Sequence, residues 1–63
     1  MKSGVVKFWN KTDGWGLIET DGDDIHVNQT DVQGQRPLAV GVPVVYEPGI
    51  YAGKEIAKNV ERI

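Results

Sequence analysis

The sequence contains no cysteine and no apolar run long enough to span a bilayer. Without thiols, disulfide bridges and thiolate metal sites are excluded. The N-terminal stretch Met1–Gly4 has no apolar signal core, so we expect a cytoplasmic location without a membrane partner. A single histidine, with no phosphate-cradling loop and no paired carboxylates, leaves little for catalysis. We therefore expect no enzymatic activity, no metal ion and no cofactor.

An excess of basic residues is also missing. The chain has seven lysines and arginines against nine aspartates and glutamates, so its formal net charge is −2. Nucleic-acid binders are usually basic, because neutralising phosphates drives their affinity. This balance argues against strong nonspecific binding to duplex DNA, but it allows a local basic face. Asp21, Asp23 and Asp24 crowd one turn, which we interpret as solvated, because a calcium site needs six or more oxygens.

The length of 63 residues predicts one domain, covering residues 1–63. A domain of ~60 residues buries only about 60% of its unfolded surface, so it needs a compact architecture. Eight glycines and three prolines divide the chain into short runs rich in Val, Ile and Tyr, without a sustained helical period. The pattern predicts an all-β fold with strands at Val5–Asn10, Trp15–Thr20, Asp24–Asn28, Val42–Glu47 and Lys54–Ile63.

The connections follow from turn chemistry. Asp-Gly pairs at 13–14 and 21–22 predict tight turns, and Thr30–Val32 predicts one helical turn opened by the Thr30 hydroxyl. Loops are predicted at Gln33–Gly41 and Pro48–Gly53. Closing five short strands into a small antiparallel barrel removes most exposed edges. The predicted interior comprises Val6, Ile18, Ile25, Val27, Leu38, Val44, Tyr46, Ile56 and Val60.

Both tryptophans and the only phenylalanine lie within KFWNKTDGWGLI, residues 7–18. One explanation is a hydrophobic core, and the other is a surface on which flat groups stack. The residues alone leave both explanations open for Phe8 and Trp15.

This segment resembles the first ribonucleoprotein motif of the bacterial cold-shock proteins, roughly G-x-V-K-W-F-N-x-x-K-G-F-G-F-I. Residues 4–18 keep that spacing, and Asp24–Gln29 matches the second motif, D-V-F-V-H-F. The match continues to Val60, through Gly34, Leu38, Gly41, Val44, Tyr46, Gly53, Ala57 and Asn59. The resemblance implies an oligonucleotide-binding fold (OB-fold), a closed five-stranded antiparallel barrel, and binding of single-stranded RNA or DNA as in cold-shock RNA chaperones.

The resemblance also implies which residues bind. Phe8, Trp15 and His26 would project from adjacent strands to stack bases, whereas Trp9 would be a partly buried packing residue. His26 is alternatively a hydrogen-bonding group or a solvated strand residue, and any lysine is alternatively a solvated charge. Lysines flanking the aromatics would meet phosphates. The implied nucleic-acid-binding residues are Lys7, Phe8, Lys11, Trp15, Leu17, His26 and Asn28.

Several departures from the family pattern reduce the number of aromatic and basic side chains on this face. Asp13 replaces a lysine, Leu17 and His26 replace aromatics, and Asn28 and Gln29 replace a histidine and a phenylalanine. Two functions therefore stay open. One is a single-strand binder, weaker than typical family members, that uses base stacking and a few lysine–phosphate contacts. The other is a barrel repurposed for protein contact. In either case we expect a monomer or weak dimer.

Overall fold

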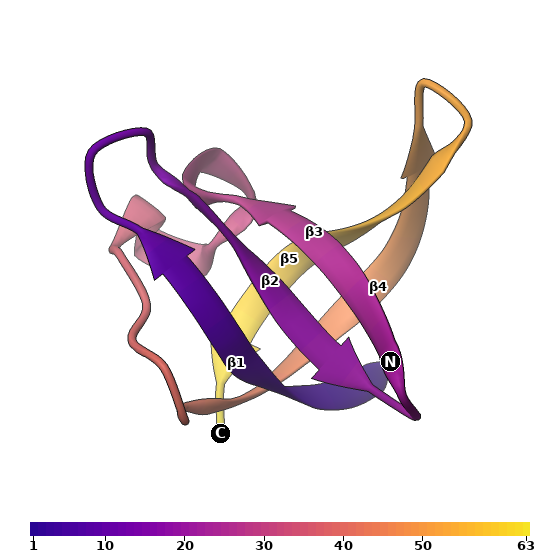
Figure 1. Cartoon of the computed structure of the whole chain (residues 1–63), viewed down its shortest axis with the longest axis horizontal. Helices are drawn as coiled ribbons and strands as arrows, with labels where there is room; N and C mark the ends of the chain where they lie inside the picture. The colour runs from indigo at the N-terminus through magenta and orange to yellow at the C-terminus, as the bar shows by residue number, and fades with distance from the viewer.

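Five strands and two short 3-10 turns make up the computed structural model, which describes residues 1–63 (Figure 1). No helical segment in it is long and apolar enough to cross a bilayer. The tight turns that follow β1 and β2 contain the Asp13-Gly14 and Asp21-Gly22 pairs, as predicted. The elements are β1 Lys2–Asn10, β2 Trp15–Thr20, β3 Asp23–Asn28, η1 Gln29–Asp31, η2 Gln33–Gln35, β4 Pro43–Tyr51 and β5 Lys54–Arg62.

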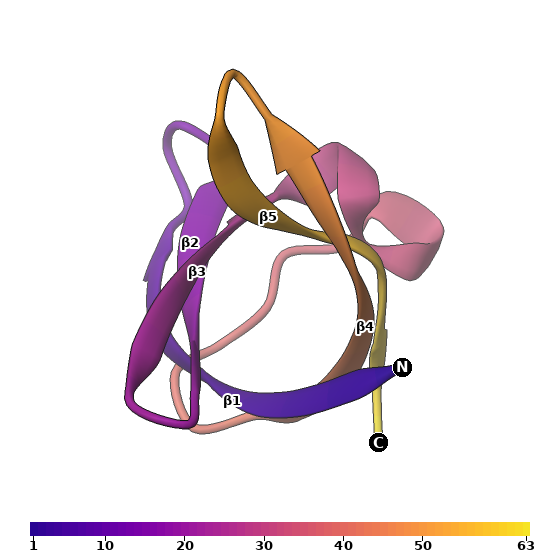
Figure 2. The ribbon, with the colours of Figure 1, turned by 90° about the vertical axis from the view of Figure 1, so that its right-hand side faces the viewer.

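The strands close into a barrel in the order β1-β2-β3-β5-β4 (Figure 2), which confirms the predicted five-stranded barrel and is consistent with an OB-fold. The expectation of a purely antiparallel sheet is wrong. β3 and β5 run parallel, with His26 opposite Ile56 and Val27 opposite Ala57. The reason is topological: residues 29–42 cross from β3 to the far side of β1, where β4 pairs, so β5 returns in the direction of β3.

An extra residue interrupts β1. Val6 lies opposite Ile18 and Phe8 lies opposite Leu17, so Lys7 has no partner of its own and forms a bulge. Val6 and Trp9 are consequently both buried although they are three residues apart, while Lys7 and Phe8 are both exposed. The bulge therefore places a cation and an aromatic ring, adjacent in sequence, on the outside of the barrel.

The core confirms the predicted interior except at Ile56, which is half-buried. Ile56 pairs with the exposed His26 and so points to the same outer face, whereas its neighbour Ala57 pairs with Val27 and points inward. Trp9 is more deeply buried than expected, with 9% of its surface exposed. The buried set is Val6, Trp9, Ile18, Ile25, Val27, Val32, Leu38, Val44, Tyr46, Ala57 and Val60.

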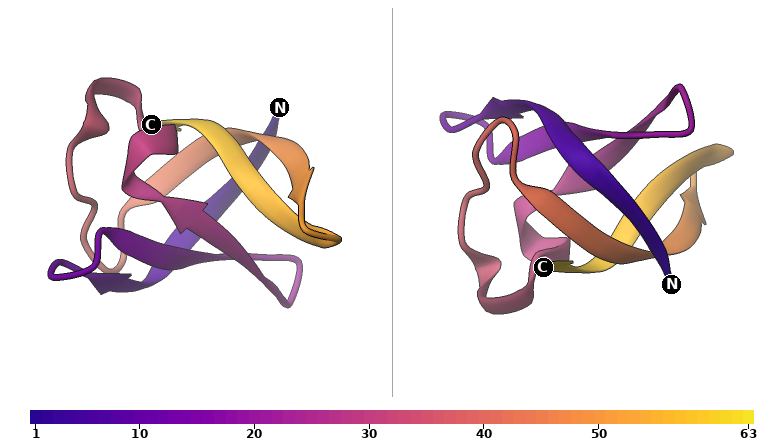
Figure 3. Two further views of the ribbon diagram at one scale, coloured as in Figure 1. Left: turned by 90° about the horizontal axis from the view of Figure 1, so that it is seen from above. Right: turned by 90° about the horizontal axis from the view of Figure 1, so that it is seen from below.

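The predicted loop at Pro48–Gly53 is wrong, because β4 continues through Pro48 to Tyr51. Only Ala52 and Gly53 form the turn, and both have positive φ, 52° and 78°, as a type I′ hairpin requires. The β4–β5 hairpin therefore projects from the barrel (Figure 3).

The helical turn also differs from the prediction, since it occupies Gln29–Asp31 rather than Thr30–Val32. Its cap is Asn28, whose Oδ1 accepts hydrogen bonds from the Thr30 amide and the Thr30 hydroxyl, both at 3.0 Å. The Thr30 hydroxyl thus donates to the cap rather than acting as the cap.

Candidate nucleic-acid interface

One outer surface of the barrel is formed by β1, β2 and β3. Phe8 lies opposite Leu17, and Leu17 lies opposite His26. Trp15 belongs to the next row of the ladder, opposite Asn28. Directly paired residues point to the same face of a sheet, so these side chains share one surface. The structure therefore brings together the aromatic and strand residues expected to bind.

Three rings on this surface, those of Phe8, Trp15 and His26, pack against one another and are called the aromatic strip below. The Trp15 ring centroid lies 5.4 Å from that of Phe8 and 5.4 Å from that of His26. The Trp15 and His26 planes differ by only 16°, whereas the Phe8 ring is tilted by 54°. Such spacings are typical of favourable aromatic pairs, so the rings hold one another in position.

The strip is accessible to a ligand. Phe8 is 43% exposed, His26 is exposed and Trp15 is half-buried. None of these rings belongs to the buried core. The placement rules out the core explanation for Phe8 and Trp15.

Trp9, the third aromatic residue of this segment, lies inside the barrel. Its indole lies against Gly16, where an added Cβ would collide with the Trp9 ring and the Phe8 carbonyl oxygen. The Trp9 indole nitrogen is buried without a hydrogen-bond partner. Only glycine at position 16 therefore leaves room for both the β1 backbone and the Trp9 indole.

The two lysines expected to contact phosphates, Lys7 and Lys11, differ in whether they form an ion pair within the protein. Lys7 Nζ lies 3.3 Å from both carboxylate oxygens of Asp24, with the two side chains 52% and 41% exposed. Lys11 is exposed on the β1–β2 turn and makes no ion pair. Of these two lysines, only Lys11 has an ammonium group that is not already paired with a carboxylate.

Asn10 organises the turn that carries Lys11. Its Oδ1 accepts hydrogen bonds from the amides of Thr12 and Asp13 at 3.0 and 3.1 Å, and its Nδ2 donates to Asp13 Oδ2 at 3.1 Å. Gly14, with φ of 73°, closes the turn. Asp13 is therefore a structural turn residue that also leaves a negative charge near Lys11.

Asn28 and Leu17 complete the predicted set. The side-chain oxygen Oδ1 of Asn28 caps η1, so only the side-chain NH₂ group of Asn28 remains for a ligand. Leu17 is half-buried between Phe8 and His26 and offers an apolar surface without a ring.

Two residues that bear on this surface were missed from the sequence. Asp24 was assigned to a solvated acidic turn, although it pairs with Lys7 across 17 residues of sequence. Tyr51 was assigned to a loop, although it ends β4 and is 74% exposed. The strand-forming residues Ile50 and Tyr51, followed by a small turn residue and glycine, were the available signal for the hairpin.

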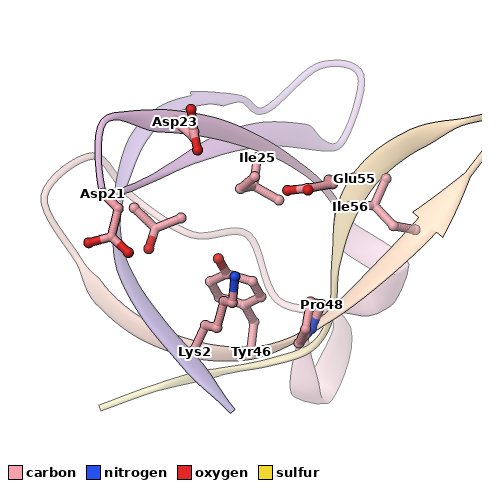
Figure 4. Close-up of a pocket in the computed structure, with 9 residues that line it drawn as sticks. Lys2, Asp21, Asp23, Ile25, Tyr46, Pro48, Glu55 and Ile56 are labelled. Atoms are coloured by element: carbon pink, nitrogen blue, oxygen red, sulfur yellow. The ribbon is translucent and has the colours of Figure 1, made fainter.

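A separate cavity lies at one end of the barrel, with the buried Tyr46 at its base and Lys2, Asp21, Asp23 and Glu55 around it (Figure 4). Its volume is about 40 Å³, which leaves room for water but not for a nucleobase. No three His, Cys, Asp or Glu side chains are gathered so as to hold a metal ion.

No model of a known protein family matches the sequence. Among curated proteins, the chain is 36% identical over 66 aligned positions to "Cold shock protein CspA" of Rhizobium meliloti (strain 1021). The alignment covers 95% of this chain and 96% of that protein. The similarity therefore concerns the whole barrel rather than one motif.

Proposed function

The chain belongs to the cold-shock protein family, a nucleic-acid-binding family without enzymatic activity, and we propose that it binds single-stranded RNA or DNA on the outer face of β1, β2 and β3. The observation that carries the proposal is the aromatic strip of Phe8, Trp15 and His26, which is accessible on one surface with the Trp15 centroid 5.4 Å from each of the other two. A core would have buried these rings.

Stacking would supply much of the affinity. Each base stacked on an aromatic ring contributes ~1–3 kcal/mol and does so with little regard to base identity. Because the three rings already pack together, little side-chain freedom is lost when a base arrives. Bases in a duplex hide their faces, so such a strip favours unpaired strands. This behaviour suits a sequence-tolerant RNA chaperone.

Phosphate contacts would be few. Lys11 is free, but Lys7 is engaged by Asp24, and the formal net charge is −2. Each phosphate contact to a single strand contributes only ~0.7 to the slope of log affinity against log salt. The protein is thus a weaker binder than basic members of its family, with a shallow salt dependence.

The same charge balance favours a second function, contact with a protein partner. Lys7, paired with Asp24, and the exposed Phe8 could contact the surface of a protein partner as readily as a nucleobase. A cytoplasmic location and a monomeric or weakly dimeric state stay predictions under either function.

A tryptophan-fluorescence titration with an oligothymidine hexamer, at low and moderate salt, tests the proposal. Phe8→Ala should lower affinity about fivefold to a hundredfold, as expected for one lost stacking contact. Val5→Ala is the matched control, because Val5 lies on the same strand and is 45% exposed against 43% for Phe8. Its affinity should equal that of the wild type. If the wild type does not bind at either salt concentration, the nucleic-acid function is wrong and the protein-contact function takes its place.

A further inference from the structure

A recess adjoins the end of the aromatic strip, between β3, η1 and the β4–β5 hairpin. Its volume is about 260 Å³, far larger than the cavity at the barrel end. Four of its six lining residues lie outside the set predicted to bind nucleic acid. The residues that line this hairpin recess are His26, Asn28, Thr30, Asp31, Tyr51 and Ile56.

We propose that the hairpin recess is a nucleobase subsite, which continues the aromatic strip onto the β4–β5 hairpin and selects guanine. The inference rests on the proposed single-strand function and adds to it a further stacking residue, Tyr51, and a base preference set by Asp31 and Asn28.

The recess lies where a bound strand would continue. His26 ends the aromatic strip on β3 and also lines the recess. The next strand around the barrel is β5, where Ile56 lies directly opposite His26. A base that leaves the strip beyond His26 therefore meets Ile56 and the hairpin.

Tyr51 supplies the ring for this base. It is 74% exposed at the end of β4, so its face is open to stacking. The turn after it is a two-residue type I′ turn, which fixes the hairpin closely. Ile56, half-buried and on the outer face, offers an apolar wall. Aromatic and apolar walls of this kind suit a flat base.

The polar groups of the recess determine which base fits. The Asp31 carboxylate makes no hydrogen bond or ion pair within the protein, so it remains an acceptor. Asn28 uses its oxygen to cap η1, which leaves its amide hydrogens as donors. A carboxylate repels phosphate, so this recess accepts a base rather than the backbone.

Guanine matches this arrangement because it is the one common base with two adjacent donors, N1–H and N2–H, on its Watson–Crick edge. A carboxylate accepts both at once. Thymine and uracil place two carbonyl oxygens beside a single N–H, and cytosine and adenine place a ring acceptor beside their amino group. Each of these would set a lone pair against Asp31. The Asn28 amide can donate to guanine O6.

The test compares three DNA hexamers by tryptophan fluorescence: oligothymidine, and the same strand with guanine at the 5′ or the 3′ end. The wild type should bind one guanine hexamer more tightly than oligothymidine. Tyr51→Ala should lower affinity for that hexamer about fivefold to a hundredfold. Asp31→Asn should abolish the guanine preference while oligothymidine affinity is kept.

Ile50→Ala is the matched control, because Ile50 precedes Tyr51, is 72% exposed against 74%, and does not line the recess. Its affinities should equal those of the wild type. The subsite is overturned if the wild type binds all three hexamers equally and Tyr51→Ala changes nothing; the single-strand function then still stands. Equal losses in Tyr51→Ala and Ile50→Ala would also overturn it, since they would indicate a general apolar contact. Failure of the wild type to bind any hexamer would remove the underlying function as well.

Discussion

Asp24→Asn should strengthen oligonucleotide binding, because it removes the carboxylate that holds Lys7. Both Asp24 oxygens lie 3.3 Å from Lys7 Nζ, but the two side chains are 52% and 41% exposed. A pair so exposed is worth at most ~1 kcal/mol, because water screens it. The affinity gain from freeing Lys7 is therefore limited to about fivefold.

The gain should depend on salt in a defined way. A free Lys7 adds about one phosphate contact, which steepens the slope of log affinity against log salt by ~0.7 for a single strand. Titrations of the wild type and Asp24→Asn with an oligothymidine hexamer at several salt concentrations measure this slope. The curves should converge as salt rises, because screening weakens exposed charges.

Asp23→Asn is the control for net charge, since it makes the same change of one unit at the preceding residue, which has no ion pair. It should have a smaller effect than Asp24→Asn. Equal effects of the two variants would contradict a specific role for the Lys7–Asp24 pair, because they would mean that only total charge matters. An unchanged slope in Asp24→Asn would show that Lys7 does not meet phosphate.

Leu17→Phe should tighten binding about fivefold to a hundredfold at every salt concentration, since it adds a ring between Phe8 and His26; unchanged affinity would show that no base reaches this position. Gly16→Ala should lower the free energy of unfolding by ~1–3 kcal/mol or more, measured in urea, because its Cβ would strike backbone and core ring. A wild-type urea midpoint would contradict the packing described. Ala52→Asn should raise the free energy of unfolding by a part of the ~1–2 kcal/mol that the left-handed conformation costs, because asparagine tolerates the positive φ of the turn better; a lower midpoint would argue against the type I′ assignment.

Local signals in the sequence were sufficient for most of the strands. The Asp-Gly turns and the β-branched runs are properties of neighbouring residues, and they located β1, β2 and β3 to within three residues. The parallel pairing of β3 with β5 depends instead on how residues 29–42 cross the barrel, which no local pattern encodes. The length of the β4–β5 hairpin was missed because Pro48 and Gly49 resemble loop residues, yet the ladder accommodates both.

The candidate site was predicted from family spacing rather than from periodicity. Strict alternation from Val6 would place Phe8 inside the barrel, and only the bulge at Lys7 turns Phe8 outward. The Lys7–Asp24 pair joins residues on β1 and β3 that come together only after folding. Such contacts decide how strongly the face binds, and they become visible only in three dimensions.

Unpaired bases should stack on the outer face of β1, β2 and β3. NMR chemical-shift mapping with an oligothymidine hexamer can locate the stacked bases, because the two tryptophan indole N–H signals report on different parts of the barrel. The signal of Trp15, on the strip, should shift strongly together with the amides of Phe8 and His26. The signal of Trp9, buried in the core, should shift much less. Shifts confined to β4 and β5, or no shifts at saturating oligonucleotide, would show that bases do not stack on this face.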